Sequence, residues 1–437
     1  MRSLVSPSPH RPSRAFAHLA RLACPGLVAV AGVLGLGCEV GISATVSPAP
    51  GPAAAPEAVT PSTPEGEPPP SPTDAGRPAP EAGADARTPD AGPAPAIATF
   101  GRWDTRDAAG PRAAWPGSKL RFRFRGAEAA VTLDELPGAG GPSEWDVALD
   151  GVWRSEPLVL TPGRATYPLA EGLPVAEHSV ELYRRTEAVG GRTQLVGVSL
   201  GAGALLPPPA PRRRVFEFLG DSLTNGYGIA GPGPQCPYSA ATQNFHTTFA
   251  AQVASALDAD EVGVAYQGKG LTKNYQRSNA LLFPELYGRA LPDDALSAWA
   301  PARLVPDAIF VMVGANDFLQ ERAQVFDPPD LAAFEAAYEA LLARARANAP
   351  QAHIFALVGP TQTDATPARY GARTDQTAAV TTAVEARQRA GDARVHYVAL
   401  EPEPTSELAG CDYHPSQAVH DRAAAELIPA VKALAGY

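Results

Sequence analysis

The chain has 437 residues, 19% of them charged and 45% hydrophobic, so it is long enough for two or three domains and can bury a sizeable core. Its formal net charge of -10 argues against a nucleic-acid partner, because such a partner selects a basic face. The charge says little about the substrate.

Residues 1–38 predict an export signal. Four arginines give a positively charged first region, and residues 27–36 give an apolar core that is too short to span a bilayer. The core runs into Cys38 in a pattern that resembles a bacterial lipoprotein signal, with Cys38 as the lipidated residue. The alternative is an ordinary cleaved signal with an incidental cysteine. We therefore expect an exported protein, in the bacterial cell envelope or outside the cell, that meets a membrane only through an anchor at Cys38.

Two segments with different compositions follow the export signal. Residues 39–97 consist largely of Pro, Ala, Gly, Ser, Thr and acidic residues, which predicts a disordered linker. Residues 98–205 alternate apolar and polar side chains with period two, most regularly from Lys119 to Arg125, in short runs separated by Gly, Pro and Asp. That pattern predicts a jelly-roll β-sandwich with one buried and one solvated face per strand. A structural role and a carbohydrate-contacting role both remain open for it.

The pattern changes again after a proline-rich connector at residues 206–213. From 214 to 437, buried strands alternate with amphipathic helices, which predicts a three-layer α/β/α domain around a parallel sheet. Five strands are expected, at 215–219, 262–266, 308–313, 353–358 and 395–399. The clearest helix runs from Leu331 to Ala347, with Asp330 as its N-cap.

Polar motifs follow three of these strands and precede the last helix. Gly220-Asp221-Ser222 follows the first strand, where open parallel sheets place their ligands. Gly268 follows the second strand, Asn316 the third, and His414 stands in the loop before the final helix. We expect all four segments to meet at one edge of the sheet.

These residue types are the ones that acyl transfer needs. A serine is a poor nucleophile until an imidazole takes its proton, which assigns Ser222 as nucleophile and His414 as base. The oxyanion of the tetrahedral intermediate needs pre-aimed donors, which the Ser222 and Gly268 N–H groups and the Asn316 amide supply. Gly270 is an alternative to Gly268. The sequence holds no H-E-x-x-H and no paired C-x-x-C motif, so it implies no catalytic metal and no cofactor.

The order and spacing of these motifs resemble the SGNH (GDSL) hydrolase superfamily. Segments in and beyond the predicted sandwich, among them residues 177–182, 236–239 and 410–416, are similar to carbohydrate esterase family 2. That resemblance implies a jelly-roll domain followed by an SGNH domain of flavodoxin-like type. It also implies removal of O-acetyl groups from plant-wall polysaccharides such as xylan and glucomannan.

The chain departs from the wider superfamily at one position. The superfamily places its triad aspartate three residues before the histidine, where this chain has Cys411. The resemblance to family 2 leaves two arrangements open, an Asp-x-His triad through Asp412 or a Ser-His dyad whose imidazole is oriented by a backbone carbonyl. Asp412 is the candidate catalytic carboxylate, and Asp221 is expected to shape the serine turn.

Cys236 and Cys411 are both expected at the rim of the site. In the oxidising compartment that an export signal implies, they are candidates for a disulfide that would fix the loop carrying His414. The alternative is two unpaired thiols. Five further histidines are expected to be exposed and inert: His178, His246, His353, His396 and His420.

The sequence as a whole predicts a serine esterase that deacetylates acetylated polysaccharide through an acyl-enzyme. Two alternatives remain: an esterase or lipase acting on another acyl ester, such as a lipid or acetylated peptidoglycan, and a non-catalytic wall-binding lipoprotein. The polysaccharide, the acetyl position and the oligomeric state do not follow from the sequence.

Overall fold

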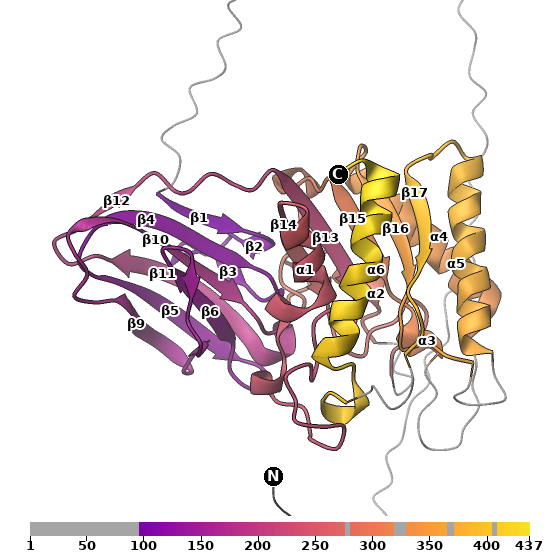
Figure 1. Ribbon diagram of the computed structural model, residues 1–437, viewed down its shortest axis with the longest axis horizontal. Coiled ribbons are helices and arrows are strands. Elements are labelled where there is room, and N and C mark those ends of the chain that lie inside the picture. Colours follow the sequence, from indigo (N-terminus) through magenta and orange to yellow (C-terminus); the bar gives the residue numbers. More distant parts are fainter. Residues whose placement is uncertain (1–95, 276–279, 319–328, 365–370, 404–408) are drawn as a thin grey trace, which may run out of the picture. The chain divides into compact units, whose positions relative to one another are not determined.

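The computed structural model (Figure 1) describes residues 96–275, 280–318, 329–364, 371–403 and 409–437. All of these lie in one compact unit, Asp85–Tyr437. The predicted export signal, including Cys38, and nearly all of the predicted linker lie outside the described residues. None of the described helices is long and apolar enough to cross a membrane.

The first domain is a β-sandwich, as predicted, of two antiparallel sheets. One has the order β1-β4-β10-β6-β7, with β12 on β4 and β8 on β6, and the other has the order β2-β3-β11-β5-β9. A shared apolar core fills the space between them. The strands are β1 (Ile97–Phe100), β2 (Trp103–Asp104), β3 (Arg112–Ala113), β4 (Lys119–Gly126), β5 (Ala129–Pro137), β6 (Glu144–Leu149), β7 (Val152–Trp153), β8 (Leu158–Val159), β9 (Gly163–Ala170), β10 (Ala176–Arg184), β11 (Gly191–Ser199) and β12 (Ala204–Leu206).

The alternation in β4 predicts only half of that strand correctly. Leu120, Phe122 and Phe124 point into the sandwich core and are at most 1% exposed. The opposite face was expected to be solvated, but Lys119 and Arg121 are 2% and 8% exposed. That expectation is wrong because this end of β4 packs against the second domain, whose carboxylates bind both cations.

The second domain has a parallel sheet of order β14-β13-β15-β16-β17, which confirms the predicted α/β fold. This is the flavodoxin-like order, with its switch point between the first and third strands of the domain, β13 and β15. The strands and helices are β13 (Arg214–Gly220), β14 (Ala259–Ala265), β15 (Ala308–Met312), β16 (His353–Val358), β17 (Val395–Ala399), α1 (Phe249–Ala256), α2 (Phe283–Leu286), α3 (Ala315–Phe318), α4 (Leu331–Asn348), α5 (Ala372–Arg389) and α6 (Gln417–Ala435).

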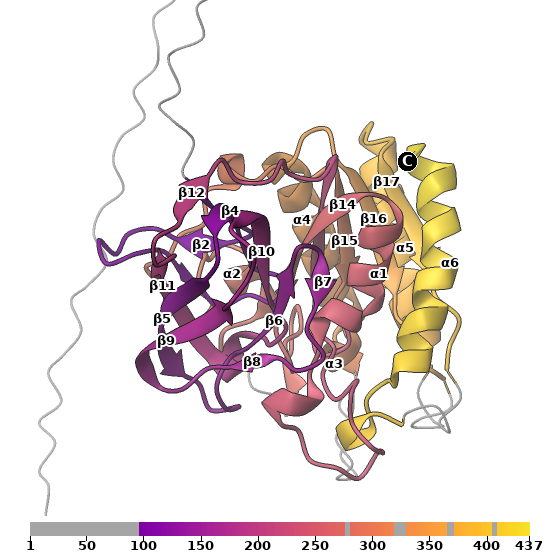
Figure 2. The same cartoon turned by 60° about the vertical axis from the view of Figure 1, so that its left-hand side comes forward.

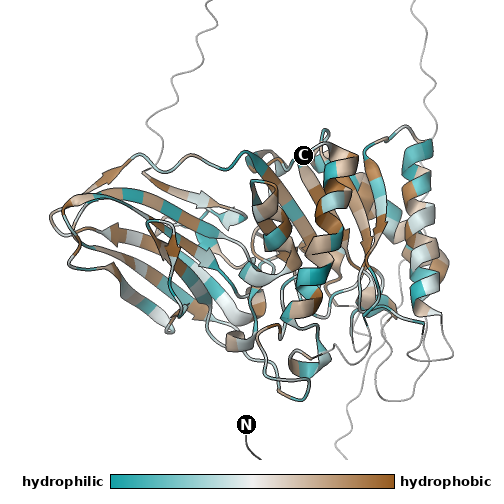
Figure 3. Cartoon of the chain, viewed as in Figure 1, coloured by the Kyte–Doolittle hydropathy of each residue, from teal (hydrophilic) through white to brown (hydrophobic). Residues whose placement is uncertain are grey.

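Helices cover both faces of the parallel sheet. Apolar residues of α1 and α6 form one core with the sheet, and those of α4 and α5 form the other. In Figure 1, α6 lies in front of the strands; in Figure 2, it lies at their right-hand side and α4 lies behind them. Figure 3 shows the strands as mostly apolar and the helices as mixed, the pattern of a sheet buried on both sides.

Helix α4 begins and ends close to the predicted bounds. Asp330 caps it by accepting hydrogen bonds from the N–H groups of Ala332 and Ala333, at 3.0 and 3.1 Å. Most of its predicted apolar stripe is buried, but Leu331 in the first turn is 41% exposed.

Buried ion pairs join the two domains. The Arg102 guanidinium of the sandwich lies 2.8 Å from the Glu217 carboxylate of β13, and the two side chains are 1% and 6% exposed. Arg121 binds both oxygens of Asp260 on β14 at 2.6 and 2.9 Å, and Lys119 lies 3.0 Å from Glu261. The sandwich is therefore part of the same folded body as the sheet that carries Ser222.

His420 in α6 was expected to be exposed and inert, and its exposure was predicted wrongly. It is 1% exposed and accepts a hydrogen bond on Nδ1 from the first N–H of α1, that of Phe249, at 3.3 Å. Burial lowers the pKa of His420 to about 3. The neutral ring thus caps α1 from a neighbouring helix, at a helix end where a cation would be unfavourable.

Removing the charge of Arg102 should strongly destabilise the whole unit. An Arg102→Met variant leaves the buried Glu217 carboxylate without its cation, a change that typically costs about 3–5 kcal/mol. We expect urea unfolding to show a loss of that size. Arg123→Met is the control: its pair with Glu177 is exposed, with side chains 37% and 45% accessible, and should matter by about 1 kcal/mol or less. Equal losses in both variants would contradict a special role for the buried pair.

His420 should make the fold acid-sensitive. Its pKa is about 3 in the folded protein and 6.5 as the reference value, so the unfolded chain binds the extra proton first as the pH falls. The stabilisation is complete above pH 6.5 and declines toward pH 3; between pH 7 and 5 it should fall by about 2 kcal/mol. His420→Asn keeps an acceptor for Phe249 but does not titrate. Urea unfolding of this variant should show a smaller loss between pH 7 and 5, and an unchanged loss would contradict the assignment.

Candidate active site

Ser222 stands directly beyond the end of β13, at the switch point of the parallel sheet. The register pairs Gly220 with Ala265 of β14 and with Met312 of β15, so the chain leaves all three strands at the same edge. The turn is tight: a Cβ on Gly220 would lie 1.9 Å from the Thr224 hydroxyl, which makes glycine necessary there. Asp221 shapes this turn as expected, because its carboxylate accepts the Leu223 N–H at 3.1 Å.

His414 reaches Ser222 from the loop before α6. Its Nε2 lies 3.0 Å from the Ser222 Oγ, across 192 residues of sequence. The serine and the imidazole are both partly exposed. This separation is within the reach of proton transfer from a serine to a general base.

The second ring nitrogen of His414 faces the backbone of Asp412. Nδ1 lies 3.1 Å from the Asp412 carbonyl oxygen, whereas the Asp412 carboxylate accepts a hydrogen bond from the Tyr227 hydroxyl at 3.3 Å. Asp412 and Tyr413 both have left-handed backbones, with φ of 52° and 58°, which is uncommon for residues other than glycine. This loop conformation brings a carbonyl to the imidazole, the arrangement that the sequence left open beside a carboxylate triad.

Tyr227 is a residue at the site whose role the sequence did not predict. Its ring lies against the His414 imidazole with centroids 4.0 Å apart and planes tilted by 32°. Burial, followed by the neighbouring Asp412 carboxylate, raises the pKa of the Tyr227 hydroxyl, so it stays protonated and donates to that carboxylate. Its position five residues after the serine was visible, but that spacing carries no specific chemistry by itself.

The structure distinguishes the two glycines considered as oxyanion donors. Gly270 is buried and donates its N–H to the Asn274 side chain at 3.1 Å. Gly268 is partly exposed, with φ of 71°, a left-handed conformation that favours glycine. Within the described residues, the N–H groups of Gly268 and Ser222 donate to no other group. These two N–H groups are therefore the ones left to bind an incoming oxygen.

The Asn316 side chain lies between the serine turn and the Gly268 loop. Its Nδ2 donates to the Asp221 carboxylate at 3.1 Å and to the Lys269 carbonyl at 2.9 Å. Burial raises the pKa of Asp221 to about 7. The Asn316 amide thus bridges the two segments that carry the other donors, and an oxyanion would have to share its N–H groups with these acceptors.

Asp317, the next residue, holds the loop that follows Gly268. Its carboxylate accepts the N–H groups of Leu271, Thr272 and Lys273 at 2.8, 2.7 and 3.0 Å. Burial raises the pKa of this carboxyl, against the lowering effect of these hydrogen bonds. Asp317 is the neighbour of Asn316 in the sequence, but no role was predicted for it.

Cys236 and Cys411 are joined in a disulfide that spans 175 residues. Backbone hydrogen bonds accompany it: the Asp412 N–H donates to the Cys236 carbonyl at 2.9 Å, and the Cys411 N–H donates to the Gly228 carbonyl at 3.0 Å. In the chain-entropy model, closing a loop of this length stabilises the fold by on the order of 5 kcal/mol. The crosslink ties the loop of His414 to the segment that follows Ser222.

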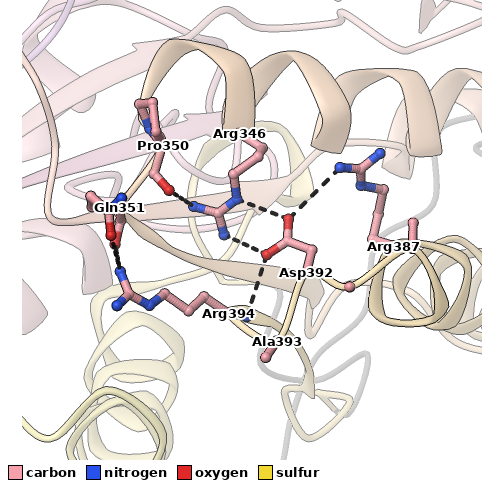
Figure 4. Close-up of a pocket in the computed structure, with 9 residues that line it drawn as sticks. Arg346, Pro350, Gln351, Arg387, Asp392, Ala393 and Arg394 are labelled. Carbon is pink, nitrogen blue, oxygen red and sulfur yellow. Dashed lines mark hydrogen bonds and ion pairs between the residues drawn. The ribbon is translucent and has the colours of Figure 1, made fainter. Parts of the chain in front are cut away.

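A hollow of about 400 Å³ lies at the opposite edge of the parallel sheet, before β17 (Figure 4). Arg346 fills one side of it, bound through two nitrogens to Asp392 at 2.8 Å each and donating to the carbonyls of Ala349 and Ala352. Its charge is compensated and the carbonyls near the end of α4 are satisfied, which is a structural arrangement. No group of three acidic, His or Cys side chains suited to a metal occurs among the described residues.

Two family models match the chain. Residues 99–209 match the model "Carbohydrate esterase 2 N-terminal", and residues 218–422 match the model "GDSL-like Lipase/Acylhydrolase family". The two matches cover the sandwich and most of the α/β domain in the order that the sequence predicts.

Relatives with curated names extend the comparison. A cellulase/esterase CelE of Acetivibrio thermocellus is 33% identical over 354 residues, which are 81% of this chain but only 41% of that protein. An acetylxylan esterase / glucomannan deacetylase of Cellvibrio japonicus is 27% identical over 344 residues, or 77% of this chain and 88% of that protein.

Solved structures agree with the sequence comparisons. A family two carbohydrate esterase from Clostridium thermocellum, solved in complex with cellohexaose, is 33% identical with a TM-score of 0.70 and covers 78% of this chain and 99% of that one. A carbohydrate esterase family 2 enzyme from Corynascus is 30% identical, with a TM-score of 0.68 over 78% of this chain and 100% of that one. The site geometry, the pair of domains and these similarities together show that the chain belongs to carbohydrate esterase family 2.

Proposed function

We propose that this protein is a carbohydrate O-acetyl esterase that works through a serine acyl-enzyme. The observation that carries the proposal is the 3.0 Å approach of His414 Nε2 to Ser222 Oγ, together with two backbone N–H groups, those of Ser222 and Gly268, that donate to no group among the described residues. That combination supplies an activated nucleophile and donors for an oxyanion, the two requirements of acyl transfer from an ester.

Ser222 and His414 divide the bond-making and proton-transfer steps between them. The Ser222 Oγ attacks the acetyl carbonyl carbon while its proton moves to Nε2 of His414. The negative charge on the former carbonyl oxygen is stabilised by the Ser222 and Gly268 N–H groups and the Asn316 amide. Collapse of this intermediate breaks the bond to the sugar oxygen, which takes the proton from His414. Water then attacks the acetyl-serine and gives a proton to His414; the bond from the acetyl carbon to Oγ breaks, Oγ takes that proton back from His414, and acetic acid leaves.

The imidazole is oriented by the Asp412 backbone in this proposal. A carbonyl acceptor at Nδ1 requires a proton on that nitrogen, so Nε2 is unprotonated and can take the serine proton. Tyr227 packs against the ring and limits its rotation. The Asp412 carboxylate acts indirectly, by holding the Tyr227 hydroxyl.

The substrate class comes from the relatives. The Cellvibrio japonicus protein is named for acetylxylan and glucomannan, and the Clostridium thermocellum esterase was solved with a cello-oligosaccharide. We extend these to acetyl esters on plant-wall polysaccharides as substrates of this chain. The predicted export signal and lipid anchor at Cys38 support action outside the cytoplasm, where such polymers occur.

Asp412→Asn should lower activity far less than the loss of a triad carboxylate would. A triad carboxylate replaced by its amide loses about 10⁴-fold in kcat, because the imidazole takes the wrong tautomer. Here the backbone carbonyl remains, and asparagine tolerates the left-handed backbone, so we expect a loss of about 10-fold or less. Steady-state hydrolysis of an aryl acetate measures it. A loss of 10³-fold or more would restore Asp412 as the triad carboxylate.

Ser222→Ala should abolish hydrolysis, because no other group can form the acyl-enzyme. We expect kcat on an aryl acetate to fall by about 10⁵–10⁶-fold while the melting temperature is maintained. Acetate release from acetylated xylan and glucomannan, compared with longer acyl esters and acetylated peptidoglycan, tests the substrate class. Preference for a long acyl chain or for peptidoglycan would overturn the substrate proposal, and a wild type no faster than Ser222→Ala would overturn the enzyme proposal.

A further inference from the structure

The sandwich contributes a fully buried carboxyl group to the active-site region. Glu187 lies in the turn between β10 and β11, and its side chain is 0% exposed. Burial raises the pKa of Glu187 to about 8. Burying an ionisable group costs free energy that an apolar side chain would not cost, so its contacts need an explanation.

The Glu187 carboxyl group binds the loop that carries Gly268. Its Oε2 accepts the backbone N–H of Gln267 at 2.9 Å. Gln267 is the residue before Gly268, so the anchored N–H is one peptide unit away from the candidate oxyanion donor. The bond crosses from the sandwich to the α/β domain and fixes the start of the turn in which Gly268 has a left-handed backbone.

The same turn also reaches the segment after Ser222. The Gln243 side chain accepts the Glu187 N–H at 3.2 Å and donates to the Asn225 carbonyl at 3.3 Å. Asn225 belongs to the serine turn, since its own N–H donates to the Asp221 carbonyl at 3.1 Å. Glu187 and Gln243 thus connect both segments that carry backbone donors.

Arg184 holds the backbone of the Glu187 turn in place. This arginine is fully buried and donates to the carbonyls of Thr186, Glu187 and Gly191 at 2.9, 3.2 and 2.7 Å. Burial lowers the pKa of Arg184 to about 10, so it keeps its charge at neutral pH. Charged donors hold carbonyls more tightly than neutral ones do.

We propose that Glu187 is a positioning residue through which the sandwich sets the place of the Gly268 donor. The inference rests on the proposed esterase function and adds that the sandwich is part of the catalytic apparatus. It does not require the sandwich to contact sugar. The Gly268 N–H is useful only if it points at the developing oxyanion, and a misplacement of about 1 Å can cost 10²-fold in rate.

The test compares two substitutions of Glu187 with a matched control. Glu187→Leu removes both acceptor oxygens, and Glu187→Gln keeps one. The control is Asp104→Asn: Asp104 is a sandwich carboxylate that is 3% exposed, and its side-chain partners are Arg106 and Arg112, two other residues of the sandwich. All three variants are made in the full chain, and kcat and KM for an aryl acetate are measured per folded molecule, with folding checked by thermal melting.

We expect kcat to fall about 10–100-fold in Glu187→Leu and less in Glu187→Gln, with KM changed by no more than about 3-fold. Affinity for a boronic acid, which forms a tetrahedral adduct on Ser222, should fall by a similar factor. Asp104→Asn should lower the melting temperature without lowering kcat. A purely structural role for Glu187 would change stability in the same way but leave kcat and boronate affinity intact.

Three results would overturn the inference: unchanged kcat in Glu187→Gln and Glu187→Leu, a loss confined to KM, or an equal loss of kcat in Asp104→Asn. If Glu187→Leu does not fold, Glu187→Gln alone decides, because its side chain has nearly the same volume. Failure of the proposed function would look different, since wild type would then be no faster than Ser222→Ala.

Discussion

The structure depends on charges buried between the sandwich and the parallel sheet. Arg102 and Glu217 pair at 2.8 Å with almost no exposure, and Glu217 stands on β13, the strand that leads to Ser222. Separating the domains would break these ion pairs and expose apolar side chains that pack across the junction, Trp115 and Tyr183 among them, which is strongly unfavourable. The two domains are therefore expected to unfold together. An accessory module that binds substrate on its own would not need such a junction.

The active site is assembled from segments that are distant in sequence and held by different interactions. The serine turn is held by its own hydrogen bonds, the Gly268 loop by Asp317 and Glu187, and the His414 loop by the disulfide to Cys236. Each support acts on the position of a group that must be pre-aimed before the reaction. Since preorganised donors account for much of an acyl-transfer enzyme's rate, these supports are part of the chemistry as well as of the fold.

The sequence predicted the features that have a local pattern. The two architectures follow from period two in the sandwich and from the alternation of strands and helices after it. The rule that ligands bind beyond strand ends predicted that Ser222 and Asn316 lie at one edge of the sheet. Features that depend on the partner domain could not be predicted in this way. Lys119 has the pattern of a solvated strand residue, and His420 that of an exposed helix residue, but both are buried by segments remote in sequence.

The same limit explains why Glu187 and Tyr227 were not predicted. Glu187 belongs to a polar turn between strands, and nothing in its neighbourhood indicates that a loop 80 residues later will donate an N–H to it. Tyr227 matches no sequence motif, and its contact with the imidazole depends on a loop that is remote in sequence. By contrast, the sequence shows that Cys411 occupies the position where the wider superfamily has its triad aspartate. That difference raised the question of which group orients His414.

The answer to that question lies in backbone conformation. Cys411 forms the disulfide and cannot act as an acceptor for the imidazole. The loop after it has left-handed backbones at Asp412 and Tyr413, and the Asp412 carbonyl lies next to Nδ1 of His414. A carbonyl cannot lose its acceptor character on titration or be removed by a side-chain substitution. It also carries no full charge, so it stabilises the imidazolium less than a carboxylate would. The disulfide and the packing of Tyr227 then matter more, because they must supply the orientation that a carboxylate's stronger hydrogen bond would otherwise provide.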